Sequence, residues 1–524
     1  MEAPMFLSVM AAILSGLLLV VSFPRYDQSY LLFIALVPLF WALRGQSRKA
    51  GFWLGIVNGL TFYLGLLSWI FYVTYVYGHL PLPVALGVLL LLAGYLSIYR
   101  GLWAWGVVWA ENRGVNLLWF APALWVVMES VQGYPISSFP WELLGHGLYL
   151  QHSLLQAADL IGTYGLSFLL VLVNAGLVAI FSPPIVKGRQ PSPLGTLAFL
   201  VILLAAWFGY GHYRQGKMAE AMARSPKIKV AVIQGNIQQG EKWDPKIVQA
   251  TLETYAKVTR QTLGEAKSTD DNAAPTLVVW PETAAPFFFN HTAGQDTRLD
   301  LLVRDIARKN HCYLLFGAPA EEDRPQGELL YNRAYLLNPQ GETVGSYDKS
   351  HLVPWGEYVP LHKVFFFIQK MVPQIGDFVE GPVGATLPLP QGKIGVLICY
   401  ESIFGYLSRA QVENGAHLLV NITNDAWFGR TSAPYQHMSM AVLRAVENRV
   451  SLARAANTGI STFISGNGHI LWTSPLEEEA GYITELPWLP GGSFYTSYGY
   501  LFPWLCVALA ILMILFPRRS RTQW

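Results

Sequence analysis

Three polar residues of the sequence each follow an apolar run that predicts a β-strand. Glu282 comes after Thr-Leu-Val-Val-Trp-Pro, Lys349 after Val-Gly-Ser-Tyr-Asp, and Cys399 after Gly-Lys-Ile-Gly-Val-Leu-Ile. A cysteine at the end of a strand holds its sulfur on a rigid element, where the sulfur can act as a nucleophile. A carboxylate, an ammonium and a thiol that meet there can perform acyl transfer. The sequence therefore predicts Glu282, Lys349 and Cys399 as catalytic residues.

The chemistry depends on moving the thiol proton to the carboxylate. With ordinary pKa values of about 8.5 and 4.3, transfer from Cys399 to Glu282 is uphill by roughly 5 to 6 kcal/mol. Burial raises the pKa of a carboxyl and a nearby ammonium lowers that of a thiol, so Lys349 is expected to narrow the gap. Lys349 and the backbone N–H of Tyr400 are expected to stabilise an oxyanion, with Glu282 as general base. The alternative is an ordinary Glu282–Lys349 ion pair beside a packed core thiol.

The elements that would position these residues alternate between strands and helices. Several strands are rich in Val, Ile and Leu on both faces, which indicates a sheet covered by helices. Helices are expected at 245–267, 299–309, 404–414 and 434–450. Strands are expected at 227–234, 276–280, 312–317, 333–337, 343–347, 393–399, 417–422, 451–456, 461–465 and 469–473.

The composition predicts a membrane protein. Only 13% of the 524 residues are charged, against about 25% in soluble proteins, and the net charge of +2 argues against a nucleic-acid partner. A span needs about 20 apolar residues. About eight transmembrane helices are expected, near 5–23, 28–43, 51–75, 82–110, 115–131, 160–181, 195–213 and 498–516. The predicted domains are a seven-helix transmembrane domain (1–213), an outer α/β catalytic domain (214–495), and a last helix with a basic tail (496–524).

Charge placement predicts the orientation of the chain. Alternate loops and the C-terminal tail carry nine Lys and Arg residues, whereas the opposite short loops carry only Arg25. Basic loops stay in the cytoplasm, so both termini are expected there and the polar domain outside. In a bacterium with an outer membrane, this domain is periplasmic. Arg100 lies inside the fourth apolar stretch and is expected to reach the cytoplasmic headgroups. A substrate role is the alternative.

Four segments of the sequence belong together in this chemistry. They are Trp280-Pro281-Glu282-Thr283, Tyr347–Pro354 running into Gly356–Pro360, Cys399-Tyr400-Glu401-Ser402, and Asn424-Asp425-Ala426-Trp427-Phe428-Gly429. In this order they resemble the nitrilase superfamily, whose catalytic set is Glu, Lys and Cys on an αββα sandwich. The resemblance implies that Glu357 sits near Lys349 and helps to position it, although Glu357 could instead cap backbone amides.

Seven spans, a nitrilase-like domain and a last span resemble the apolipoprotein N-acyltransferase family. Further matching motifs are Gly235-Asn236-Ile237, Lys242-Trp243-Asp244, Phe139-Pro140-Trp141, Ala158-Asp159-Leu160 and Gly162–Phe168. The resemblance implies a Cys399 thioester formed from a phospholipid, with the sn-1 chain of phosphatidylethanolamine as the expected donor. The acceptor would be the N-terminal amine of a diacylglyceryl-modified apolipoprotein. No cofactor or metal is expected.

Several further residues have two possible roles. Trp243, Tyr400 and Glu401 are predicted substrate contacts. Tyr400 and Glu401 are expected to shape the acyl pocket and to hydrogen-bond the loop, and packing is the alternative for all three residues. Two apolar runs, 286–289 and 364–373, predict loops that enter the lipid leaflet and gate the acyl chain, unless they pack against the protein. The rival functions are a membrane-bound nitrilase or amidase, a non-catalytic transporter or receptor, and transfer to a different amine.

Overall fold

The chain divides into two units that are described separately. In this computed structural model, the described residues are 5–133, 139–181, 192–238, 245–265, 275–290, 297–324, 327–354, 356–358 and 378–516. The first unit comprises Met1–Gly216 and Tyr498–Trp524, and the second comprises Lys217–Ser497. The assignment of these units to membrane and periplasm stays a prediction.

The described part of the first unit is helical. Four helices (α1, α5, α8 and α9) are long and apolar enough to cross a membrane, or five if the bent pair of Arg48–Leu66 and Trp69–Tyr77 forms one span. Three shorter apolar helices accompany them, and the count of about eight spans stays a prediction. The bounds are α1 Met5–Ser22, η1 Ser29–Phe33, α2 Val37–Leu43, α3 Arg48–Leu66, α4 Trp69–Tyr72, η2 Val73–Tyr77, α5 Leu82–Asn112, α6 Leu117–Gln132, η3 Leu144–Leu148, α7 His152–Leu155, α8 Ala158–Phe181, α9 Pro193–Arg224 and α15 Leu501–Leu515.

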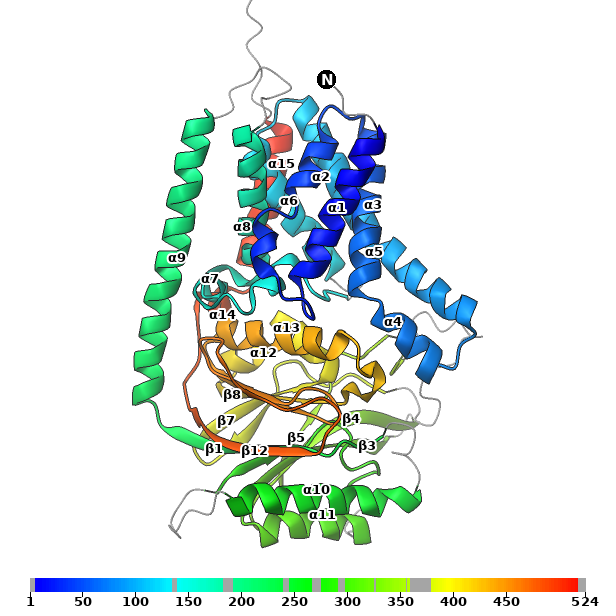
Figure 1. Cartoon of the computed structure of the whole chain (residues 1–524). Coiled ribbons are helices and arrows are strands. Elements are labelled where there is room, and N and C mark those ends of the chain that lie inside the picture. The colour runs from blue at the N-terminus through cyan, green and yellow to red at the C-terminus, as the bar shows by residue number, and fades with distance from the viewer. Residues whose placement is uncertain are drawn as a thin grey trace, which may run out of the picture. The chain divides into compact units, whose positions relative to one another are not determined.

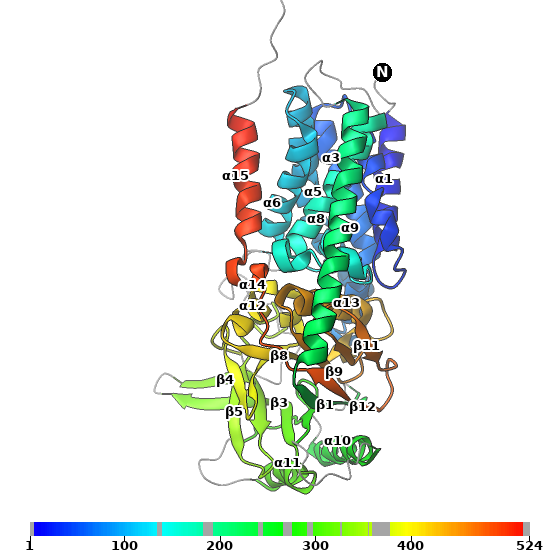
Figure 2. The same cartoon turned by 90° about the vertical axis from the view of Figure 1, so that its left-hand side faces the viewer.

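Helix α9 is longer than the sequence predicts. It forms one continuous helix of 32 residues that ends at Arg224 (Figure 2), whereas the apolar pattern stops near residue 213. The polar continuation is rich in Ala, Met, Glu, Lys and Arg, which are all good helix formers. Apolar patterning marks where a span ends, and helix propensity carries the helix beyond that point.

Arg100 does not extend toward headgroups, so that expectation is wrong. Its side chain lies on α5 and is only 7% exposed. The guanidinium carbon stacks 3.9 Å from the centroid of the Trp125 ring and 5.2 Å from that of Phe62. Stacking on aromatic faces stabilises a cation that has been withdrawn from water. Arg100 therefore packs between helices of the first unit.

The second unit contains two six-stranded sheets with helices on the outside, which is the αββα sandwich expected. The strand orders are β12-β1-β2-β3-β4-β5 and β11-β10-β9-β8-β7-β6. Figure 1 shows α10 and α11 along one side of the pair of sheets and α12 and α13 along the other. The strands are β1 Lys227–Gln234, β2 Leu277–Val279, β3 Tyr313–Arg324, β4 Gly327–Leu337, β5 Thr343–Asp348, β6 Thr386–Leu389, β7 Gly392–Ile398, β8 Ala416–Thr423, β9 Ser451–Ala456, β10 Thr462–Ile464, β11 Ile470–Thr473 and β12 Ala480–Pro487. The helices are α10 Pro245–Glu265, α11 Arg298–Lys309, η4 Cys399–Ile403, α12 Gly405–Glu413, η5 Asp425–Phe428, α13 Ala433–Asn448 and α14 Phe494–Tyr498.

The central strands are buried on both faces because successive side chains point to opposite sides of a sheet. In β1, Val230 and Val232 join the core between the sheets, whereas Ala231 and Ile233 pack in the core under α10 and α11. The strands β1, β2 and β3 run parallel, as do β7, β8 and β9. Residues that follow neighbouring parallel strands therefore emerge at a common sheet edge.

Candidate active site

Cys399 lies where strand β7 ends and the 3₁₀ helix η4 begins. Its φ is +54°, in the left-handed region, which costs a non-glycine residue of order 1 to 3 kcal/mol. The side chain is partly exposed and forms no disulfide. The turn is fastened by Glu401, whose Oε2 accepts the backbone N–H of Ile398 at 2.7 Å. The surrounding structure therefore holds the cysteine in a strained conformation.

Lys349 follows β5 and lies between two carboxylates. Its Nζ is 2.9 Å from Glu357 Oε1 and 3.6 Å from Glu282 Oε1, and the side chain is 1% exposed. Burial alone would lower the pKa of Lys349, but the carboxylates of Glu357 and Glu282 outweigh burial and raise the pKa above its ordinary value. The amine therefore remains an ammonium inside the protein.

Glu282, which follows β2, is oriented by two donors. Asn332 Nδ2 donates to Glu282 Oε1 at 2.8 Å, and the backbone N–H of Asn424 donates to Glu282 Oε2 at 3.0 Å. The same Asn332 nitrogen lies 2.8 Å from Glu357 Oε1. Glu357 Oε2 also accepts the backbone N–H of Val353 at 2.8 Å. Glu357 therefore contacts the lysine and also caps a backbone amide.

The structure brings the carboxylate, the ammonium and the thiol into electrostatic contact. Burial raises the pKa of the Cys399 thiol above its ordinary value, the negative charge of Glu282 raises it further, and Lys349 partly offsets both. Lys349 thus lowers the pKa of the thiol, as expected, but burial raises that pKa by more. The thiol is protonated at neutral pH, so an attack by sulfur requires a base to take its proton.

The raised pKa predicts how Cys399 reacts with a small alkylating agent. Because the thiolate is the reactive form, alkylation by chloroacetamide should be slower at pH 7 to 9 than for an unperturbed cysteine. The rate should rise about tenfold per pH unit through pH 9 without a plateau, since the titration midpoint lies higher. Mass spectrometry of the Cys399 peptide measures this rate separately from Cys312 and Cys506. A plateau below pH 8 would show a preformed thiolate and contradict the prediction.

Glu401 hydrogen-bonds the loop segments around it, as expected. Its side chain is fully buried. Glu401 Oε1 accepts the backbone N–H groups of Ser350 at 2.7 Å and His351 at 3.1 Å, and also the hydroxyl of Tyr347 at 3.0 Å. Together with the bond from Ile398, these contacts tie the segment after Lys349 to the turn that carries Cys399. The carboxylate is fully engaged within the protein, and its substrate contact stays a prediction.

Comparisons with known proteins extend over nearly the whole chain. A family model described as the apolipoprotein N-acyltransferase N-terminal domain matches residues 15–176, and one described as carbon-nitrogen hydrolase matches 229–487. An apolipoprotein N-acyltransferase from Geobacter metallireducens is 43% identical over 511 residues, covering 97% of this chain and 95% of that protein. The chain belongs to the apolipoprotein N-acyltransferase family. The family member from Azotobacter vinelandii is 34% identical and covers 96% and 93% of the two chains.

Solved structures with the carbon-nitrogen hydrolase fold are more distant. A mutant amidase from Nesterenkonia sp. AN1 is 22% identical with a TM-score of 0.37, covering 50% of this chain and 92% of that chain. A Saccharomyces cerevisiae protein of branch 10 of the nitrilase superfamily is 20% identical with a TM-score of 0.38 and covers 57% and 97%. This apolipoprotein N-acyltransferase family member is a membrane protein with a nitrilase-fold domain, as its apolar helices and its relatives together show.

Other predicted contacts of this family member have mixed outcomes. Tyr400 is buried and its ring lies 5.1 Å from that of Phe404, so its substrate contact stays a prediction. Trp243 and the whole run 364–373 lie outside the described residues. For the run 286–289, Phe289 is 1% exposed and packs 5.0 Å from Phe316 in the core under α11. A lipid-gating role for Phe289 is therefore wrong, because the ring completes that core.

The two asparagines that orient Glu282 are not predicted from the sequence. Asn332 lies in the middle of β4, and nothing in its neighbours marks it. Asn424 follows the apolar strand β8. The same position after an apolar run predicts Glu282, Lys349 and Cys399 as functional residues, so this pattern could have identified Asn424 as well. The contact from Asn424 is made by its backbone N–H, which the side-chain type does not reveal.

Proposed function

We propose that this chain transfers an acyl group from a phospholipid to the N-terminal amine of a diacylglyceryl-modified apolipoprotein, through a thioester on Cys399. The observation that supports this most is the buried contact of the Lys349 ammonium with both Glu282 and Glu357, beside a strained, partly exposed thiol. Glu282, Lys349 and Cys399 are the proposed catalytic residues, and Glu357 positions the lysine.

The first half-reaction moves the acyl group onto sulfur. Glu282 takes the thiol proton as the sulfur of Cys399 attacks the ester carbonyl. The Lys349 ammonium stabilises the tetrahedral oxyanion, with the backbone N–H of Tyr400 as the proposed second donor. The intermediate then breaks its C–O bond. The departing alkoxide takes the proton from Glu282, so a lysophospholipid leaves and the thioester remains.

The second half-reaction moves the acyl group to nitrogen. The free amine of the lipoprotein cysteine attacks the thioester carbonyl, and Glu282 accepts a proton from that amine. The C–S bond breaks, the proton returns to sulfur, and the amide product leaves. Glu282 and Cys399 are thereby restored to their starting protonation states, so the cycle needs no oxidant, metal or other co-reactant.

The proposal also includes the acyl donor, the acceptor and the location of the enzyme. The donor is the sn-1 chain of phosphatidylethanolamine, and the acceptor is the apolipoprotein amine. The location is the inner membrane of a bacterium, with Lys217–Ser497 on the periplasmic side and both termini in the cytoplasm. The family membership and the apolar helices of the first unit support a membrane substrate. The uneven distribution of Lys and Arg among the loops supports this orientation.

A chase experiment distinguishes transfer from hydrolysis, because both would use the same side chains. Enzyme loaded with radiolabelled acyl groups from phosphatidylethanolamine should keep its label in buffer for many minutes. Adding a synthetic diacylglyceryl-cysteine lipopeptide should then move the label to the lipopeptide within a few turnover times. The same lipopeptide with an acetylated N-terminus is the matched control and should receive none. Release of the label as free fatty acid at equal rates with and without the lipopeptide would establish a hydrolase.

A further inference from the structure

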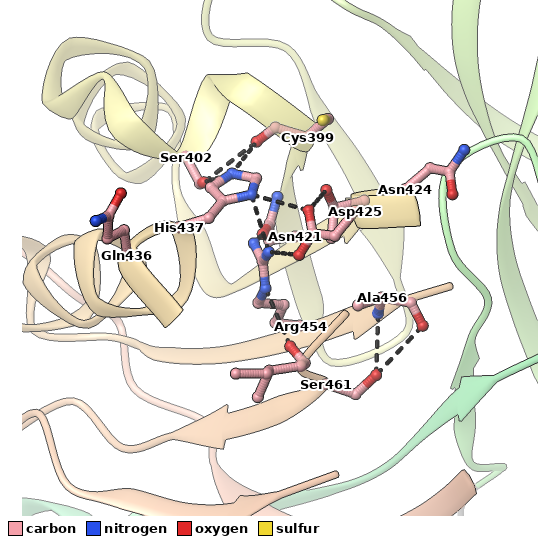
Figure 3. Close-up of polar contacts among 12 residues, drawn as sticks. Cys399, Ser402, Asn421, Asn424, Asp425, Gln436, His437, Arg454, Ala456 and Ser461 are labelled. Atoms are coloured by element: carbon pink, nitrogen blue, oxygen red, sulfur yellow. Dashed lines mark hydrogen bonds and ion pairs between the residues drawn. The ribbon is translucent and has the colours of Figure 1, made fainter. Parts of the chain in front are cut away.

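A buried polar network lies behind the proposed nucleophile and outside the roles assigned so far. It joins Asp425 of η5, His437 of α13 and Arg454 of β9, and each of the three is at most 1% exposed. Arg454 Nη2 donates to Asp425 Oδ2 at 2.7 Å. The His437 ring nitrogen Nδ1 lies 3.0 Å from both Asp425 Oδ1 and Arg454 Nη2 (Figure 3). The guanidinium of Arg454, which Asp425 holds in place, thus fixes the orientation of the imidazole.

The other ring nitrogen of His437 reaches the backbone of the nucleophile. Nε2 lies 3.1 Å from the carbonyl oxygen of Cys399 and 3.0 Å from Ser402 Oγ. A carbonyl oxygen can only accept a hydrogen bond and a guanidinium can only donate one, so the neutral ring carries its proton on Nε2, and its Nδ1 accepts from Arg454 Nη2. The contact of Nδ1 with Asp425 Oδ1 is then not a hydrogen bond, and that oxygen accepts the hydroxyl of Thr423 instead. Burial and the charge of Arg454 lower the pKa of His437, which keeps the ring neutral at neutral pH. In Figure 3 the Cys399 carbonyl points toward the imidazole and the sulfur points away from it.

The backbone conformation of Cys399 at this contact must be stabilised by surrounding residues. Cys399 has a φ of +54°, a conformation that side-chain-bearing residues rarely adopt and that persists only where surrounding contacts hold it. Ser402 Oγ also donates to the same carbonyl, at 3.2 Å. Two donors therefore converge on the carbonyl oxygen of the strained residue.

The network also reaches the proposed general base. Asp425 directly follows Asn424, whose backbone N–H donates to Glu282 Oε2 at 3.0 Å. The hydroxyl of Thr423 also donates to Asp425 Oδ1, at 2.9 Å. Residues 423–425 are thus anchored through the Asp425 side chain. One cluster of buried groups contacts both the segment that carries the nucleophile and the segment that orients its base.

We infer that His437, fixed by Arg454 and through it by Asp425, is a positioning residue that holds the Cys399 carbonyl so that the thiol stays aligned with Glu282 and Lys349. This inference rests on the proposed function, since the alignment matters for thioester formation. His437 touches no substrate in this account and moves no proton. A loss of its Nε2 donor changes the geometry of the nucleophile and leaves the substrate contacts in place.

The test compares His437→Gln with His437→Met in the full-length enzyme in phosphatidylethanolamine vesicles. Glutamine keeps an N–H donor at the reach of Nε2, whereas methionine fills the space without one. His437→Met should lower kcat for acyl-enzyme formation about 100-fold with little change in KM, because binding is untouched. His437→Gln should recover to within about tenfold of wild type. Both variants should keep a cooperative melting transition.

A matched control lies next to this residue on the same helix. Gln436 is equally buried, and its side chain points away from the network in Figure 3, so Gln436→Met removes a buried polar group from α13 without touching Cys399. Equal losses in Gln436→Met and His437→Met, or no rescue by glutamine, would assign His437 a merely structural role and overturn the inference. Chloroacetamide alkylation of Cys399 is a second readout. It should show the same ranking of variants even if phospholipid is the wrong donor, which separates failure of this inference from failure of the proposed function.

Discussion

Glu282→Gln is expected to slow thioester formation on Cys399 by about 1000-fold. A positioned general base contributes about 10² to 10⁴ to a rate, and the partly exposed, protonated thiol described above cannot react without one. Glutamine is nearly the same size but accepts no proton at these pH values. The fall should appear in kcat with KM nearly unchanged, because the carboxylate acts in the transition state. Stopped-time mass spectrometry of the Cys399 peptide measures the rate.

The control for this variant is Glu253→Gln, which makes the same chemical change on the exposed face of α10. It should have wild-type activity, and both proteins should melt within a few degrees of wild type. An acylation rate for Glu282→Gln within tenfold of wild type would show that another group takes the thiol proton. It would leave Glu282 as no more than the ion-pair partner of Lys349.

Lys349→Met is expected to have a similarly large effect for two reasons. It removes a donor to the oxyanion, a loss that typically lowers a rate by about 10² to 10³. It also leaves Glu282 and Glu357 buried near each other without a cation, so that the two carboxylates repel each other. Removing one partner of a buried ion pair costs about 3 to 5 kcal/mol, so the melting temperature should fall together with the acylation rate.

A double variant separates the loss of stability from the loss of catalysis. Lys349→Met combined with Glu357→Gln removes the surplus buried negative charge, so it should regain most of the lost thermal stability. It should still acylate Cys399 about 100-fold more slowly than wild type, because no ammonium faces the oxyanion. Lys309→Met, an exposed lysine at the end of α11, controls for the substitution itself. Recovery of the acylation rate to near wild type in the double variant would show that Lys349 only neutralises Glu357.

The proposed catalytic residues could be located from sequence because each follows a strand that its own residues specify. The run before Cys399 is almost entirely Gly, Val, Leu and Ile, and β7 ends at the residue before it. The run before Glu282 forms β2 in the same way. Where a strand is buried on both faces, its pattern is local and strong, so the residue at its end is predictable.

Elements that depend on distant partners could not be predicted in this way. Strand β12 was missed because its mixed sequence is arranged as a strand by antiparallel pairing with β1, about 250 residues earlier. Strand β3 continues to Arg324 and strand β4 begins at Gly327, and this part of the pair contains polar residues. These residues are extended only because the two strands pair with each other. The contacts of Asn332 with Glu282 and Glu357 have the same origin, because a mid-strand asparagine is recognisable only once the neighbouring strands are placed.

Thioester formation on Cys399 is the central claim, and mass spectrometry after incubation with phosphatidylethanolamine of one defined sn-1 chain tests it most directly. The Cys399 peptide should gain the mass of that acyl group minus one hydrogen, and hydroxylamine should remove it. Cys399→Ser should show no hydroxylamine-sensitive adduct. An unmodified Cys399 peptide during lipopeptide acylation, or an acyl adduct on another residue, would contradict the account.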